Sequence, residues 1–251
     1  MEKHQRIRLL IALAITASLQ TGCTVPFESI GFLKKSSLPA SDGLSSVEST
    51  SESLDPLTEK SIRKYGSVIQ KYSERWGFDP RLILAIMKQE SRFRHNAKSR
   101  KGAYGLMQIM PVTQGELVEK LGVGNATTPY NNIKAGIFHL RSLYKVFEGV
   151  PEKDRLRLAL GAYNAGLSRI LDAQDIARFL GDDPNSWKAV RDALPLLSRR
   201  YHTLHKSIWA EGMPRGGYFR GWRQTTSYVE NIMKFYREYQ RVLPAAELAS
   251  L

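Results

Sequence analysis

A single glutamate, Glu90, lies on the apolar face of a predicted helix, close to the end of that helix. Ile83, Ile86 and Met87 precede it by seven, four and three residues, which places all four side chains on one face. Burial and the negative end of the helix dipole both favour the protonated carboxyl group, so we expect a raised pKa. A carboxylic acid that keeps its proton near neutral pH is suited to general acid catalysis.

For Glu90 alone, the alternative is an ion pair with Arg92 or Arg94 at the end of the helix. The segment that follows favours chemistry instead. Residues 91–115 contain no Asp or Glu, and they include two glycines three residues apart. Such glycines permit tight turns and a close approach of the backbone to a ligand.

The side chains of this glycine segment suit a sugar ligand. Gly102 begins the segment. Tyr104 and Met107 offer apolar surface to a sugar ring. Gln108 offers a donor and an acceptor to hydroxyl and amide groups. Taken alone, a glycine segment with a glutamine is more often only a loop, so its meaning depends on the motifs around it.

Three motifs occur in order along the chain: Glu90–Phe93, Gly102–Pro111 and Ala162–Gly166. Their order and spacing resemble those of the catalytic domain of the soluble lytic transglycosylases (SLT), and the resemblance covers Thr58 to Val242. The C-terminal part is similar to the membrane-bound type F branch of this family, in Leu171–Ala173, Trp187, Ala193–Leu197 and Tyr228–Val229.

The resemblance implies a mostly α, lysozyme-like fold of the goose-type lysozyme and SLT class, with a substrate cleft. It implies a lytic transglycosylase that cleaves the β-1,4 bond between N-acetylmuramic acid and N-acetylglucosamine in peptidoglycan glycan strands. Glu90 would protonate the bridging oxygen and then accept the proton of the C6 hydroxyl that attacks C1. The product carries a 1,6-anhydromuramoyl end, and the reaction needs neither water nor a cofactor.

The resemblance also implies roles for residues around the acid. Tyr228 matches a tyrosine whose hydroxyl approaches the catalytic carboxyl group. This chain has Gln224 where the family often has Glu, which removes one partner of a supporting ion pair. Tyr163 and Tyr228 each continue an apolar helix stripe, so packing alone is the alternative for both. The implied substrate-binding residues are Ser91, Gly102, Tyr104, Met107, Gln108, Tyr163, Asn164 and Tyr228.

The spacing of apolar residues predicts helices through most of the chain and no alternating strands, so the fold class is mostly α. We expect Thr58 to cap the first helix, which continues to Trp76, and Asp79 to cap the next, with Pro80 in its first turn. Gly166 is expected as a C-cap. The predicted helices are Thr58–Trp76, Arg81–Glu90, Asn131–Phe147, Asp154–Asn164, Leu167–Leu180, Trp187–Leu194 and Thr226–Val242.

The N-terminal residues are typical of an export signal. Lys3, Arg6 and Arg8 precede an apolar run that is too short to span a bilayer. Cys23 is the only cysteine, and its placement resembles a bacterial lipobox, with an ordinary secretory signal as the alternative. We therefore expect residues 1–22 to be a lipoprotein signal peptide, 23–57 a Ser-rich, lipid-anchored linker, and 58–251 the catalytic domain.

The expected location is the outer membrane, facing the periplasm, because Thr24 follows Cys23 and gives no inner-membrane retention signal; a secreted periplasmic protein is the alternative. The net charge of +13 indicates a polyanionic partner. The export signal excludes nucleic acid and favours the cell wall and the membrane. No metal site is expected, since His202 and His205 have the spacing of a ligand pair without further ligands.

Two other functions compete with lytic transglycosylation. A hydrolytic muramidase of the same fold would need a second carboxylate in the cleft, such as Asp172 or Glu116. A non-catalytic wall-binding lipoprotein would need no buried acid, so the placement of Glu90 argues against it.

Overall fold

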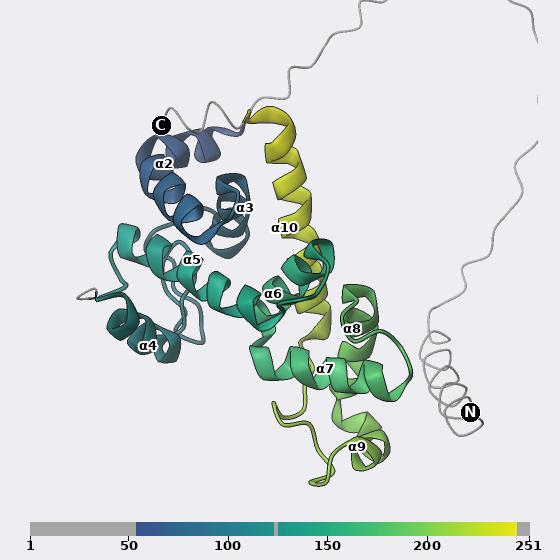
Figure 1. Ribbon diagram of the computed structural model, residues 1–251. Helices are drawn as coiled ribbons and strands as arrows, with labels where there is room; N and C mark the ends of the chain where they lie inside the picture. The colour runs from purple at the N-terminus through teal and green to yellow at the C-terminus, as the bar shows by residue number, and fades with distance from the viewer. Residues whose placement is uncertain (1–53, 123–124, 245–251) are drawn as a thin grey trace, which may run out of the picture. The chain divides into compact units, whose positions relative to one another are not determined.

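The computed structural model describes residues 54–122 and 125–244 (Figure 1). The predicted signal peptide, Cys23 and nearly all of the predicted linker lie outside these residues. The described part is helical and contains no strand, only isolated bridges that pair Tyr104 with Lys98 and with Ile109. The helices are α2 (Pro56–Trp76), α3 (Pro80–Ser91), α4 (Pro111–Leu121), α5 (Pro129–Val146), α6 (Glu152–Ala165), α7 (Leu167–Phe179), α8 (Trp187–Ala193), α9 (His202–Ile208) and α10 (Trp222–Val242), with 3₁₀ turns at Leu194–Leu197 and Arg199–Tyr201.

Every predicted helix is present, and the mostly α class is confirmed. Two helices were not predicted. α9 has seven residues, too few for a periodic pattern to emerge, and α4 begins at Pro111 directly after the glycine segment. Within the described residues, no helix combines the length and apolarity that crossing a bilayer requires.

The cap of α2 corrects one expectation. Asp55, not Thr58, is the N-cap, because its carboxylate accepts the backbone N–H of Thr58 at 3.0 Å and the Thr58 hydroxyl at 2.7 Å. Thr58 is already inside the helix. Asp79 caps α3 as expected and accepts the N–H of Arg81 at 2.9 Å, and Gly166 ends α6 as expected.

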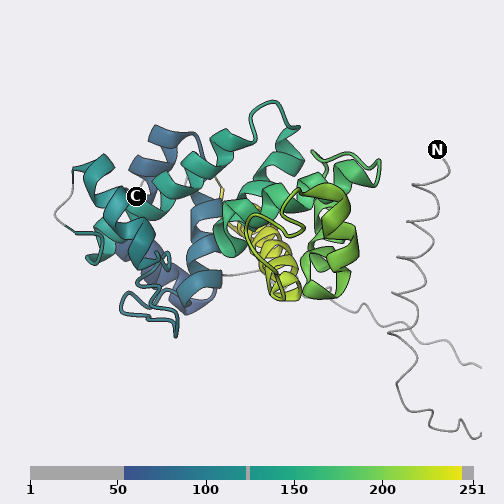
Figure 2. The same cartoon turned by 90° about the horizontal axis from the view of Figure 1, so that it is seen from below.

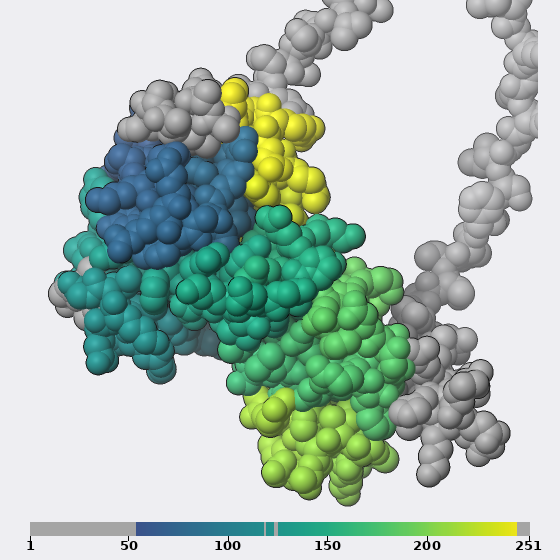
Figure 3. Space-filling model, viewed as in Figure 1, coloured from purple at the N-terminus to yellow at the C-terminus, as the bar shows by residue number. Residues whose placement is uncertain are grey.

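The helix that carries Glu90, α3, packs against α2 and α10 (Figure 1), and Figure 3 shows the N-terminal part of the described domain against the surface of α10. All residues of α3 from Leu82 to Met87 are buried, with at most 3% of each exposed. Burial of one such aliphatic side chain stabilises the fold by about 1.5–3 kcal/mol relative to exposure. This short helix is therefore held by its packing, and its C-terminal end is fixed in place.

The last helix, α10, packs against both α3 and α6, as the view in Figure 2 also shows. Its C-terminal half is tied to the start of the domain by two tyrosine hydroxyls. Tyr236 donates to the Asp79 carboxylate at 2.9 Å, and Tyr239 lies 2.9 Å from the Thr58 hydroxyl. These contacts fix the rotation of α10, and so decide which of its side chains reach α3.

Candidate active site

Glu90 lies in the last turn of α3, at the helix end and on the apolar face that the sequence predicts. Its side chain is half-buried, and its Oε1 accepts a hydrogen bond from the Tyr228 hydroxyl of α10 at 2.6 Å. Burial raises the pKa of Glu90 to about 7, and the hydrogen bond from Tyr228 opposes this rise only in part. The direction is the one that the sequence predicts.

Two buried tyrosines adjoin this carboxyl group. Burial, and then the charge of Glu90, raises the pKa values of Tyr163 and Tyr228 well above the ordinary value. Both hydroxyls therefore remain protonated donors at any working pH. Tyr163 of α6 uses its hydroxyl to donate to the Met107 carbonyl at 2.8 Å, which links α6 to the glycine segment.

An asparagine that the sequence analysis missed holds the glycine segment in place. The Asn132 side chain accepts the N–H of Met107 at 2.8 Å and donates to the carbonyls of Tyr104 at 3.0 Å and Ala126 at 3.2 Å. It is buried, with 1% exposed. The sequence did contain a signal for this role. Asn132 is a polar amide on the apolar face of a predicted helix, four residues before Gly136 and eight before Leu140.

Two glycines make room for this contact. A Cβ on Gly105, whose φ is +82°, would lie 2.5 Å from the Asn132 side chain. A Cβ on Gly136 of α5 would lie 2.5 Å from the Met107 side chain. Both distances are shorter than any normal carbon contact, so the segment can approach α5 only because these positions lack side chains.

Ser91 and Met107 lie beside the acid but face the protein interior. The Ser91 hydroxyl donates to the carbonyls of Met87 at 3.1 Å and Leu106 at 3.0 Å. The Met107 side chain is completely buried against Gly136. This placement does not fit the expectation that these two side chains contact a sugar, because the interior has engaged both. They position the glycine segment instead.

A groove of about 490 Å³ lies between the glycine segment, α5 and α6. Gln108, Tyr163 and Asn164 line it, as do Ala165 and Gly166 of the third motif. Gln108 donates to the carbonyls of Ala97 at 3.0 Å and Gly105 at 2.9 Å, and Asn164 accepts the Thr225 hydroxyl at 2.8 Å. The protein thereby fixes both amide groups in orientation.

Gly102 and Tyr104 are not among the residues that line this groove. Gly102 turns the chain with a φ of +87° and donates its N–H to Ser99 at 3.0 Å. Tyr104 is half-buried and exchanges two backbone hydrogen bonds with Ile109, each 3.0 Å long. Both residues shape the segment, and the structure does not bring them together with Gln108 at the groove.

His139 of α5 also lines the groove and was not singled out from the sequence. Its ring centre lies 5.1 Å from that of Tyr163. Burial lowers the pKa of His139 to about 4, although Glu116 opposes the change. The imidazole is therefore neutral at pH 7. A single histidine without partners in the sequence carries no signal that could have indicated this position.

Neither carboxylate that a hydrolytic mechanism would require is poised for it. Asp172 is fully buried and accepts the backbone N–H groups of Arg215 at 3.3 Å and Gly216 at 2.7 Å, so it anchors a loop. Glu116 is exposed on α4. Among residues 54–122 and 125–244, no group of acidic, His or Cys side chains is arranged to hold a metal ion.

Comparison with known proteins agrees with this geometry. Residues 67–185 match the family model of the transglycosylase SLT domain, and residues 12–117 match a second model with the same description. The chain is 35% identical over 176 residues to a membrane-bound lytic murein transglycosylase F of Desulfosudis oleivorans, covering 70% of this chain and 36% of the relative. For a protein of the same name, numbered 1, from Alkalilimnicola ehrlichii, the identity is 36%, covering 72% and 34%.

The chain thus spans about a third of the length of these curated relatives. Among solved structures, the 70 kDa soluble lytic transglycosylase SLT70 of Escherichia coli superposes with a TM-score of 0.51 at 24% identity, covering 77% of this chain and 27% of that one. This likeness confirms the lysozyme-like fold. From the matched residues and the helical fold together, residues 67–185 are those of a transglycosylase SLT domain.

Proposed function

We propose that this chain is a peptidoglycan lytic transglycosylase that cleaves the β-1,4 bond between N-acetylmuramic acid and N-acetylglucosamine without water. One observation carries the proposal. Glu90, with a pKa of about 7, is hydrogen-bonded to Tyr228 and lies beside Tyr163. Tyr163 lines the groove that Gln108 and Asn164 also line, which we call the saccharide groove because its volume suits a sugar. The SLT domain model that residues 67–185 match supports the same reaction.

The mechanism uses one carboxyl group twice. Protonated Glu90 gives its proton to the bridging oxygen as the bond from that oxygen to C1 of N-acetylmuramic acid breaks. The carboxylate then takes the proton of the C6 hydroxyl of the same sugar, whose oxygen forms the new bond to C1. The proton lost in the first half is regained in the second, so no water is consumed. The substrate's N-acetyl group stabilises the charge at C1 between the two halves.

Tyr228 suits the second half of this cycle. Its hydroxyl donates to Oε1 of Glu90 at 2.6 Å, and a hydrogen bond of this kind favours the carboxylate over the acid. Burial favours the acid. The two effects together keep the pKa near 7, where the group both donates and accepts a proton readily.

A hydrolytic muramidase of the same fold is the weaker candidate. It would use a second carboxylate to activate water. Asp172 is engaged with backbone N–H groups inside the protein, and Glu116 is exposed on α4. A wall-binding protein without activity is also disfavoured, because binding alone gives no reason to bury an acid at a cost in stability.

The experiment digests purified sacculi with wild-type protein and with Glu90→Gln protein, and it analyses the released products by mass spectrometry. We expect turnover to fall by about 10³-fold, within the range of lost general acid–base catalysis, while binding to sacculi is retained. Glu211→Gln is the matched control, because it makes the same chemical change on an exposed carboxylate that does not line the groove. Anhydromuropeptides released by Glu90→Gln at close to the wild-type rate would refute the assignment, and products heavier by one water would indicate hydrolysis.

We also propose that the protein acts in the cell envelope as an outer-membrane lipoprotein acylated at Cys23, facing the periplasm. The lipobox-like placement of Cys23 supports this, as do relatives named membrane-bound. Labelling of cells with an alkyne fatty acid checks it. The wild-type protein should take up the label, and a Cys23→Ser variant should not.

A further inference from the structure

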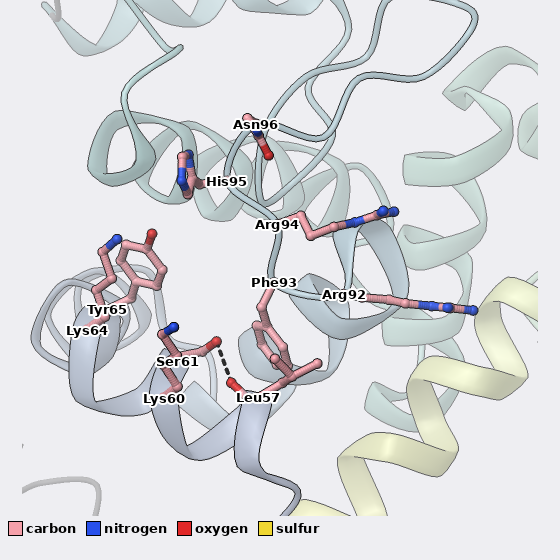
Figure 4. Close-up of a pocket in the computed structure, with 10 residues that line it drawn as sticks. All are labelled: Leu57, Lys60, Ser61, Lys64, Tyr65, Arg92, Phe93, Arg94, His95 and Asn96. Atoms are coloured by element: carbon pink, nitrogen blue, oxygen red, sulfur yellow. Dashed lines mark hydrogen bonds between the residues drawn. The ribbon is translucent and has the colours of Figure 1, made fainter.

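A second hollow, separate from the saccharide groove, opens between the N-terminal half of α2 and the segment after Glu90 (Figure 4). It has a volume of about 520 Å³. Leu57, Tyr65 and Phe93 give it apolar surface, and Leu57 is 58% exposed. We call this hollow the cationic pocket, because its other lining residues include Lys60, Lys64, Arg92 and Arg94.

No acidic residue lines the cationic pocket. Across residues 54–122 and 125–244, none of its Lys and Arg side chains forms an ion pair with a carboxylate. Arg94 donates to the Ser91 carbonyl at 3.1 Å, and Lys64 lies 5.3 Å from the centre of the Tyr65 ring. Lys60 and Lys64 lie beside this apolar floor without a carboxylate partner, so they create a positive potential that attracts an anion. The side chains of Arg92 and Arg94 point away from Leu57 and Tyr65 (Figure 4).

The backbone beneath the pocket is in an unusual conformation. Arg92 and Phe93 have φ values of +51° and +61°, in the left-handed region that side chains other than glycine seldom adopt. Two consecutive residues held there lower stability by about 1–3 kcal/mol each, and such strain persists where ligands are clamped. The turn directs Phe93 toward Leu57, and Arg92 toward α10 (Figure 4).

The cationic pocket extends toward the catalytic carboxyl group. Through Arg92 and Phe93 it shares a wall with a smaller hollow of about 360 Å³, which Gln89 and Asn231 also line. Gln89 precedes Glu90, and Asn231 lies one helical turn after Tyr228 on α10. Through these lining residues the hollows adjoin α3 and α10, the helices that carry Glu90 and Tyr228.

We infer that the cationic pocket binds the short acidic peptide that the glycan strand carries on its muramic acid. Such a peptide has several carboxylates for the cations and small apolar side chains for the floor. A peptide attached to a sugar at Glu90 would leave the site past α3 and α10, whose residues Gln89 and Asn231 line the hollow that adjoins the cationic pocket. The saccharide groove, with Lys101 as its only Lys or Arg, suits the uncharged part of the strand.

This inference rests on the proposed function, and its test compares two substrates. Peptide-bearing strands and strands stripped of peptide by an amidase are digested with Lys60→Glu/Lys64→Glu protein. We expect the ratio of kcat/KM on peptide-bearing strands to that on stripped strands to fall about tenfold, because two attractive charges become repulsive. Lys60→Arg/Lys64→Arg should keep the wild-type ratio.

Lys145→Glu/Lys153→Glu is the matched control, with the same change in net charge at exposed positions that line neither hollow. An equal loss on both substrates, or an equal fall in the ratio for the control, would overturn the inference. Failure of the proposed function would look different, since neither substrate would then yield anhydromuropeptides with wild-type protein.

Direct binding keeps the inference testable in that case as well. Titration calorimetry with a free acidic tetrapeptide should show binding that Lys60→Glu/Lys64→Glu weakens about tenfold and that amidation of the peptide's carboxylates abolishes. Leu57→Ser, at an exposed position on the floor, should weaken it severalfold. Absence of peptide binding, together with charge-dependent binding to phosphatidylglycerol vesicles, would assign the pocket to a membrane surface instead.

Discussion

At the scale of single residues, the environment of Glu90 sets the chemistry. Burial favours the acid and Tyr228 favours the carboxylate, and the balance places the pKa at about 7. The neighbouring tyrosines stay protonated, and His139 stays neutral, with a pKa of about 4. Glu90 is thus the group in this site whose charge changes near neutral pH, and two consequences can be measured.

The first consequence is the pH dependence of turnover. The first half of the reaction needs protonated Glu90, so kcat/KM should decrease as the pH rises through about 7. In Tyr228→Phe, the hydrogen bond that favours the carboxylate is lost, and this alkaline limb should move to higher pH while the rate below it decreases. Release of anhydromuropeptides, followed from pH 5 to 9, gives both profiles. A limb that stays in place in Tyr228→Phe would contradict the proposed role of this hydrogen bond.

The second consequence is a cost in stability. Burial raises the folded-state pKa of Glu90 from its ordinary value of 4.5 to about 7, so the folded protein binds more protons than the unfolded chain between these pH values. The stabilisation that the protonated carboxyl group provides is fully present below pH 4.5 and is lost as the pH rises to about 7. Glu90→Gln should therefore raise the free energy of unfolding at pH 8 by up to about 3 kcal/mol, and by much less at pH 4. Denaturant titrations at both pH values measure this difference.

At the scale of elements, the site depends on how closely the glycine segment approaches α5. Asn132 bonds to that segment through two hydrogen bonds, to Met107 and Tyr104, and Gly105 and Gly136 leave the space that the approach needs. The saccharide groove is formed by the same approach, since Gln108 belongs to the segment and His139 to α5. Helix propensity plays no part in this, and a better helix former at Gly136 should harm the protein.

Gly136→Ala tests that claim against a matched control. Its Cβ would lie 2.5 Å from the Met107 side chain, so we expect a loss of about 1–3 kcal/mol in unfolding free energy and reduced turnover. Gly115→Ala in α4 has no atom within 4 Å of its Cβ and should gain about 0.5–1 kcal/mol from helix propensity alone. Thermal unfolding of both variants separates the effects. A stabilised Gly136→Ala protein would show that the segment does not need this approach.

At the scale of the whole described domain, Asp79 joins α10, the last described helix, to the start of α3. Its carboxylate caps α3, pairs with Arg81 at 2.6 Å and accepts the Tyr236 hydroxyl of α10 at 2.9 Å. Burial raises the pKa of Asp79, but its hydrogen bonds to Arg81 and Tyr236 lower the pKa by more. The net effect is a pKa below the ordinary value. The contact fixes α10 along α3 and thereby brings Tyr228 to Glu90.

Asp79→Ala should lower the free energy of unfolding by about 2–3 kcal/mol, because it removes a helix cap and two side-chain partners. The folded-state pKa is depressed, so the stabilisation is present above the unfolded value of 3.8 and is lost as the pH falls through the folded value. The difference between wild type and variant should accordingly shrink in acid. Guanidinium unfolding at pH 7 and pH 3 measures it, and a difference that is unchanged at pH 3 would contradict this account.

The sequence by itself determined all the described helices except α4 and α9, the apolar face that carries Glu90 and the direction of its pKa shift, because helical periodicity and the dipole are local properties. Only the tertiary structure decided that Asn132 holds the glycine segment, that Ser91 and Met107 face inward, that Asp172 anchors a loop, and that Lys60 and Lys64 join Arg92 around one pocket. These outcomes depend on contacts between residues 15 or more positions apart, and the pattern along one helix carries no information about what packs against it.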